Sequence, residues 1–144
     1  LPVLEDGRAA PPPIADDPDP LADQVTLSEG QSRRETRTDL DTGVMRYEIA
    51  TDTGLVQHPE HGMVWHETRH EVWEVAPEDP ATATGDLVFT TMRQRDGMRA
   101  ETRAEIRFTC GPAAYDAEVT LTAQEGGTEL FRRSWMLHFP RDHI

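Results

Sequence analysis

The stretch from Met98 to Cys110 constrains the fold more than any other part of the sequence. Apolar or small residues alternate there with charged residues, in the order MRAETRAEIRFTC. Side chains of a β-strand point alternately to the two faces of a sheet. A period of two therefore predicts one long strand with an inner apolar face and an outer face of alternating Arg and Glu. We interpret that outer face as solvated rather than as a binding patch.

Similar alternation predicts further strands on both sides of this stretch. They are separated by turn sequences such as Asp-Leu-Asp-Thr-Gly at residues 39–43 and the glycine pair at residues 126–127. In the last run Arg133 shares a side with Phe131 and Trp135, so the alternation is imperfect there. These strands are expected at residues 33–38, 45–49, 63–75, 86–92, 115–124 and 130–139. Strands with short turns and without helices predict an all-β chain, a β-sandwich with jelly-roll or Greek-key connections.

The N-terminal residues 1–23 differ in composition from the rest of the chain. Six of the eleven prolines and five acidic residues fall within the first twenty positions. Proline donates no backbone hydrogen bond, so this composition opposes both helices and sheets. We predict a Pro-rich acidic strap or linker at residues 1–23 and one domain at residues 24–144. The chain begins with Leu1 rather than Met, and we therefore expect that an upstream portion has been removed.

The charge and cysteine content exclude several classes of partner. The formal net charge is −13, which repels phosphate backbones and anionic lipid headgroups, so we expect neither nucleic acid nor a membrane as partner. Cys110 is the only cysteine, which rules out an intrachain disulfide and a four-cysteine zinc site. The sequence has neither a long apolar run nor the layout of a signal peptide. We expect a cytoplasmic protein.

The sequence His66-Glu67-Thr68-Arg69-His70 matches the H-E-x-x-H pattern of zinc proteases. That motif works on a helix, where residues four apart share a face and bind one Zn²⁺ while the Glu acts as general base. The surrounding residues favour a strand, because valines and tryptophans are frequent and no helix N-cap precedes them. His66 and His70 are then expected on one face and Glu67 on the other, and a zinc metalloprotease remains only a remote alternative.

A third zinc ligand is also not evident. The extended H-E-x-x-H-x-x-G-x-x-H pattern would require Gly and His where Trp73 and Ala76 stand. Glu101 and Glu105 are conceivable ligands, yet both lie in the most regular predicted strand. His58 and His61 lie in the preceding loop, and with His66 and His70 they could form a structural or adventitious metal site, which is better supported than catalysis. The favoured interpretation is four ordinary surface histidines.

No other catalytic constellation is evident. The chain contains no G-x-S-x-G elbow and no phosphate-binding glycine loop, and Cys110 is expected on the inner face of its strand, where thiols are usually inert. We therefore assign no catalytic, cofactor-binding or metal-binding residue and expect no cofactor.

Short motifs in the C-terminal half occur in a familiar order. They are Arg99-Ala100-Glu101-Thr102-Arg103, Glu125-Gly126, Phe131-Arg132-Arg133-Ser134-Trp135 and Pro140-Arg141-Asp142. With the opening LPV, the DLDTG turn and EDPATATGD, they resemble the C-terminal domain of CocE/NonD-type (cocaine esterase and Xaa-Pro dipeptidyl-peptidase-like) α/β-hydrolases. The chain departs from that pattern at Gln124, Met136 and His143.

The resemblance implies a fold and a partner. In this family a Ser-Asp-His triad resides in an N-terminal α/β-hydrolase domain, and the C-terminal domain is a jelly roll of galactose-binding-like topology that packs against it. No position here matches the triad motifs, so the chain alone is expected to be a non-catalytic part of a serine hydrolase acting on ester or amide bonds. The expected partner is the catalytic domain of the same polypeptide, and self-association stays open. The alternative is a self-sufficient carbohydrate- or ligand-binding β-sandwich that uses Trp65, Trp73 and Trp135 as stacking platforms.

Overall fold

The computed structural model describes residues 24–141, which form nine β-strands and no helix. The strands are β1 (Val25–Ser28), β2 (Gln31–Thr38), β3 (Met45–Asp52), β4 (Leu55–Gln57), β5 (Val64–Ala76), β6 (Asp79–Arg95), β7 (Met98–Cys110), β8 (Ala114–Glu125) and β9 (Thr128–Pro140). The prediction of an all-β chain is confirmed. The predicted strap at residues 1–23 lies outside the described residues. Within residues 24–141 there is no helix long and apolar enough to cross a membrane.

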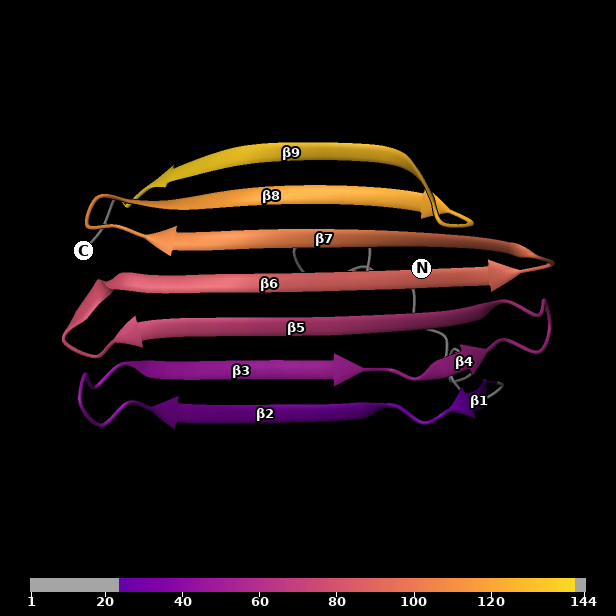
Figure 1. Ribbon diagram of the computed structural model, residues 1–144, viewed down its shortest axis with the longest axis horizontal. Helices are drawn as coiled ribbons and strands as arrows, with labels where there is room; N and C mark the ends of the chain where they lie inside the picture. The colour runs from indigo at the N-terminus through magenta and orange to yellow at the C-terminus, as the bar shows by residue number, and fades with distance from the viewer. Residues whose placement is uncertain (1–23, 142–144) are drawn as a thin grey trace, which may run out of the picture.

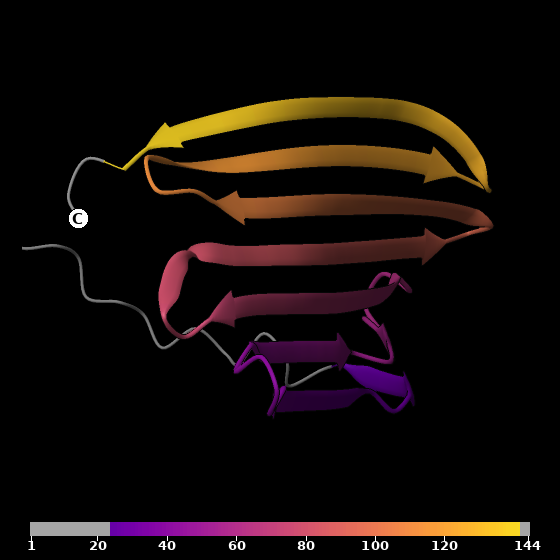
Figure 2. The ribbon, with the colours of Figure 1, turned by 60° about the vertical axis from the view of Figure 1, so that its left-hand side comes forward.

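All nine strands belong to one antiparallel sheet (Figure 1). From β5 to β9 each strand pairs with the next one in the chain. On the other side of β5 lie β3 and β4, which pair with different parts of β5. β2 pairs with β3, and β1 pairs with β4. Figure 2 shows that the sheet is curved. Because the long strands follow one another as a meander, the jelly-roll connections are not confirmed among the described strands.

The long strands form largely where the alternation predicts them. β7 spans the predicted residues 98–110, whereas β6 runs from Asp79 to Arg95 and is much longer than the predicted 86–92. Pro80 and Gly85 lie in this additional part. Proline is tolerated at the beginning of a strand, and glycine is tolerated where another group approaches the backbone closely. A Cβ atom at Gly85 would lie 2.6 Å from Cζ3 of Trp73, so the neighbouring strand occupies the space that a side chain would need.

The pairing register separates the side chains into two faces of different character. Residues paired across neighbouring strands point to the same side. We define the apolar face as the side that carries Ile106 of β7 and the charged face as the opposite side, which carries Glu105. The larger apolar-face side chains are Met45, Tyr47, Ile49, Val56, Trp65, Trp73, Val75, Leu87, Phe89, Met98, Ile106, Phe108, Tyr115, Val119, Leu121, Phe131, Trp135, Leu137 and Phe139.

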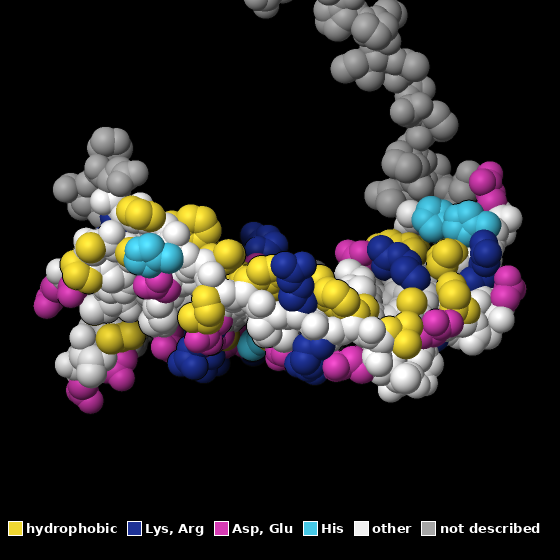
Figure 3. Space-filling view, turned by 90° about the horizontal axis from the view of Figure 1, so that it is seen from above, with side chains coloured by type: hydrophobic (Ala, Val, Ile, Leu, Met, Phe, Trp, Pro, Cys, Tyr) yellow, Lys and Arg dark blue, Asp and Glu magenta, His cyan; other side chains and the backbone are white. Residues whose placement is uncertain are grey.

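The sheet has almost no buried core. Of the described apolar residues only Ile49, Val56 and Met92 are buried, and Met92 lies on the charged face. Figure 3 looks along the sheet from the β9 side, with hydrophobic side chains mostly toward the upper side and arginines on both sides. A domain normally buries its apolar sheet face against a second layer. The described residues supply one layer only, so most of the apolar face is incompletely covered.

Candidate interaction surface

The zinc-protease motif lies on strand β5, as its composition predicts. His66 and His70 point to the charged face, and Glu67 points to the apolar face, where its carboxylate accepts a hydrogen bond from Arg93 at 2.9 Å. His66 Nε2 donates to Asp52 Oδ1 at 2.7 Å. The helical geometry that places two histidines and a general base around one Zn²⁺ is therefore not present.

The other proposed metal ligands also have partners of their own. Glu101 accepts hydrogen bonds from Arg99 and Gln124, and Glu105 binds Arg103 at 2.9 Å. The rings of His58 and His61 lie 5.1 Å apart in the loop before β5. Within residues 24–141 no group of three or more His, Cys, Asp or Glu side chains is arranged to hold a metal ion.

Cys110 lies at the end of β7 beside a cation. The Sγ atom accepts a hydrogen bond from Arg141 Nη1 at 3.2 Å, and the same Nη1 donates to the Gly111 carbonyl at 2.9 Å. The guanidinium also lies 4.9 Å from the ring centroid of Tyr115. Neither contact supplies a general base, so the described residues do not form the thiol–base pair that activates many nucleophilic cysteines.

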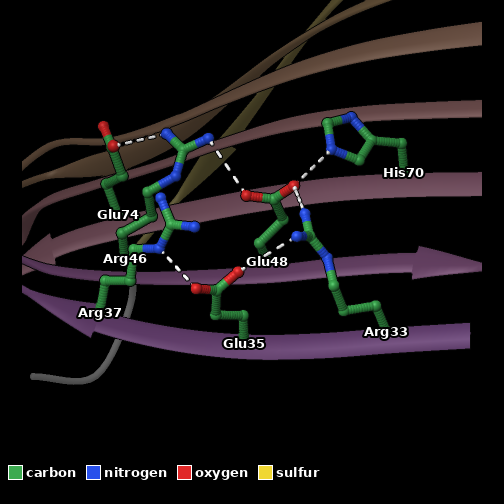
Figure 4. A network of polar contacts seen from close by, with 7 residues as sticks. All are labelled: Arg33, Glu35, Arg37, Arg46, Glu48, His70 and Glu74. Carbon is green, nitrogen blue, oxygen red and sulfur yellow. Dashed lines mark hydrogen bonds and ion pairs between the residues drawn. The ribbon is translucent and has the colours of Figure 1, made fainter.

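A network of opposite charges crosses β2, β3 and β5 on the charged face (Figure 4). Its members are Arg33, Glu35, Arg37, Arg46, Glu48, His70 and Glu74. Glu48 is central, because it binds Arg33 at 3.1 Å, His70 at 3.1 Å and Arg46 at 3.6 Å. The hydrogen bond from His70, with the nearby arginines, lowers the pKa of the Glu48 carboxyl below its usual value.

The charges of this network satisfy one another. Arg46 continues it to Glu74 at 2.9 Å, and Glu35 pairs with Arg37 at 2.6 Å. Exposed pairs of this kind contribute about 0–1 kcal/mol each. The charges of this network are satisfied within the charged face, which leaves the apolar face as the candidate functional surface.

The centre of the apolar face contains a buried carboxylate. Glu71 is only 4% exposed, although it lies among apolar side chains. Its Oε1 accepts a hydrogen bond from Arg69 Nε, and its Oε2 accepts one from Trp73 Nε1 at 3.0 Å. The Arg69 contact, helped by Trp73, lowers the pKa of the Glu71 carboxyl. A buried charge with two partners is a satisfied structural group, and it fixes the orientation of the Trp73 ring.

Aromatic rings connect the strands across this face. Trp73 lies over Gly85 and reaches Phe108, with ring centroids 5.8 Å apart. Phe108 in turn stacks on Tyr115 at 5.7 Å. These contacts run from β5 to β8 across the apolar face.

The two ends of the apolar face are exposed. Met45 and Tyr47 on β3 are 40% and 38% exposed and border an open apolar hollow of about 390 Å³. On β9, Phe131 is 44% exposed and Phe139 is 52% exposed, with Leu137 between them also exposed. Contiguous apolar surface on a folded protein marks an interaction site. Its position on both sides of the aromatic cluster indicates a broad contact across the curved sheet rather than a pocket for a small ligand.

The tryptophans do not form an open stacking platform. The guanidinium of Arg93 lies 5.7 Å from the Trp65 ring, and that of Arg133 lies 5.0 Å from the Trp135 ring. Trp73 is covered from one side by the backbone at Gly85. Each ring has a neighbour at its surface, which disfavours the use of these side chains to stack on a sugar.

Comparison of the chain with protein-family models, with curated proteins and with solved structures gives no match. The interaction surface is thus defined by its own geometry. The alternation in the sequence identifies the apolar face of β7 to β9, including the imperfection at Arg133. It gives no sign that the face lacks a covering layer, because that property depends on the connections between strands.

Proposed function

We propose that this chain is a non-catalytic β-sheet domain that packs through its apolar face against the catalytic domain of a serine-type hydrolase in the same polypeptide. It stabilises that domain, which cleaves ester or amide bonds. The observation that carries the proposal is the apolar face itself, whose side chains on β3 and β9 are exposed within the described residues. Covering such a face against another folded domain stabilises both by about 25 cal/mol per Å² of apolar surface removed from water.

Two further features support the proposal. The sequence motifs at residues 99–103, 131–135 and 140–142 resemble the C-terminal domain of CocE/NonD-type hydrolases. The polar groups that would be candidates for chemistry, His66, His70 and Cys110, are engaged by neighbouring carboxylates or by Arg141. The single cysteine of this chain, which forms no intrachain disulfide, supports a cytoplasmic location.

The mass of the native polypeptide tests the proposal. An antibody raised against this domain should detect, in the source cells, a product several times heavier than 16.2 kDa. That product should react with a fluorophosphonate probe for serine hydrolases, and the chain alone should neither react nor hydrolyse p-nitrophenyl acetate. A native product of 16.2 kDa, or esterase activity of the isolated chain that an organophosphate abolishes, would refute the proposal.

A further inference from the structure

The apolar face carries an excess of cations, although the chain as a whole is strongly acidic. By register this face holds five arginines and three glutamates, in a chain of net charge −13. They are Arg34, Arg69, Arg93, Arg95, Arg133, Glu67, Glu71 and Glu125. The surface that has the most exposed apolar side chains is thus also the one that attracts negative charge.

The arginines of this face fall into two groups. Arg69 pairs with Glu71, Arg93 with Glu67, and Arg95 with the neighbouring Asp96. Arg34 and Arg133 have no ion-pair partner among residues 24–141. Arg133 is placed directly between the exposed apolar side chains of β9, so any surface that covers those side chains also covers its guanidinium.

Arg133 lies among the apolar-face side chains of β9. It lies opposite Leu121 of β8, between Phe131 and Trp135 on its own strand, and is held at 5.0 Å from the Trp135 ring. The adjacent Arg132 points to the charged face, where it binds Glu129 through both Nε and Nη2 at 3.1 and 2.7 Å. The two neighbouring arginines are thus exposed side chains of one strand, of which Arg132 has an ion-pair partner within the described sheet and Arg133 has none there.

Covering Arg133 without a counter-ion is unfavourable. Desolvating a charge costs several kcal/mol unless it is paired and hydrogen-bonded. A second copy of this chain, docked face to face, would bring two cation-rich surfaces together. A partner with a carboxylate opposite Arg133 instead gains a charge-assisted hydrogen bond inside an apolar contact, the environment in which interfacial Arg and Trp contribute most to binding.

We propose that the apolar face binds a protein surface that is itself apolar and presents a carboxylate to Arg133, with Trp135 beside Arg133 and Phe139 farther along β9 as apolar anchors. This inference rests on the proposed function, since it assigns that surface to the hydrolase domain of the same polypeptide. It adds a chemical requirement, negative charge within apolar surface, that a purely apolar packing role would not impose.

Two dyes of different charge test this requirement on the chain. 8-Anilinonaphthalene-1-sulfonate is apolar and anionic, whereas Nile red is apolar and neutral. Arg133→Gln should weaken binding of the anionic dye about two- to fivefold, the range for loss of one exposed charge contact, and leave Nile red unchanged. Arg132→Gln is the matched control and should change neither. Arg133→Lys should retain most of the binding, and far-UV circular dichroism should show that all variants remain folded.

The outcomes separate the two proposals. Equal weakening by Arg133→Gln and Arg132→Gln would show a general charge effect and overturn the inference. Weaker binding of both dyes in Phe139→Ser, with no effect of Arg133→Gln, would also overturn it, while leaving an apolar docking face in place. The parent hydrolase is tested independently by the mass of the native polypeptide, so a failure of the dye prediction does not refute the proposed function.

Discussion

Replacing Gly85 by alanine should destabilise the sheet, although alanine is normally the better residue inside a strand. Gly85 lies in the middle of β6, directly beneath the Trp73 ring. A Cβ atom there would lie 2.6 Å from Cζ3 and 2.7 Å from Cε3 of that ring, whereas ordinary contacts begin at 3.4 Å. The ring would have to move by about 0.8 Å to accept the methyl group.

The ring is not free to make that movement. Its Nε1 donates to the buried Glu71 at 3.0 Å, and its edge contacts Phe108. Overpacking of this kind costs about 1–3 kcal/mol. The opposing gain from replacing glycine is about 0.5–1 kcal/mol, because alanine has less conformational freedom to lose. We therefore expect Gly85→Ala to lower the free energy of unfolding by about 1–2 kcal/mol and the melting temperature by several degrees.

Urea unfolding followed by far-UV circular dichroism measures this difference. Gly111→Ala is the control, since a Cβ at Gly111 meets only the Ala114 carbonyl oxygen at 3.5 Å and should be nearly neutral. In a Trp73→Phe background, which lacks the outer ring of the indole, Gly85→Ala should cost markedly less. A neutral or stabilising effect of Gly85→Ala, or the same cost in both backgrounds, would refute the argument.

Two further predictions concern backbone conformation and pH. Gly54 has φ +69°, and a Cβ there would collide with the backbone carbonyl oxygen of Ser28. Gly54→Ala should therefore lower the free energy of unfolding in urea by more than about 2 kcal/mol. Gly62 has φ +66° and open space around it, so Gly62→Ala should lower that free energy only by the cost of the left-handed conformation, about 1–2 kcal/mol. Equal costs at both positions would show that the collision is relieved. The hydrogen bond from Arg69 is the chief cause that lowers the pKa of Glu71 from 4.5. The contribution of this ionised carboxylate to the free energy of unfolding is therefore complete above pH 4.5 and is lost as the pH falls through the lower pKa of the folded state. The urea concentration at the unfolding midpoint should therefore decrease as the pH is lowered below 4.5. The midpoint of Glu71→Gln should decrease less steeply over the same pH range, and parallel curves for the two proteins would contradict this assignment.

The sequence predicts the long strands where its alternation is regular. It does not predict strand residues whose conformation depends on contacts with another strand. β7 forms over residues 98–110 as predicted, because thirteen positions repeat one rule without interruption. The first part of β6 was not predicted, since Pro80 and Gly85 are typical of turns. Gly85 is compatible with a strand because Trp73 fills the space above it, and that contact arises only after β5 and β6 pair.

The short strands and the number of layers are harder to predict for a different reason. β1 and β4 have four and three residues, too few for a period of two to be recognised. The alternation also states which side chains share a face, but it contains no information about what covers that face. The described strands form a single sheet, so the expected jelly-roll connections are left without support from the observed pairings.

Two charged residues on the apolar face show how the structure limits what a partner has to provide. Glu71 is buried, and its carboxylate is already bound by Arg69 and Trp73, so covering it further costs little. Arg133 is exposed, and among residues 24–141 its guanidinium has an aromatic ring but no carboxylate beside it, so covering it requires an acceptor from outside the described sheet. The alternation in the sequence places both residues on this face and does not distinguish between them. Their different surroundings, visible only after the strands pair, make Glu71 a determinant of stability and Arg133 a determinant of partner choice.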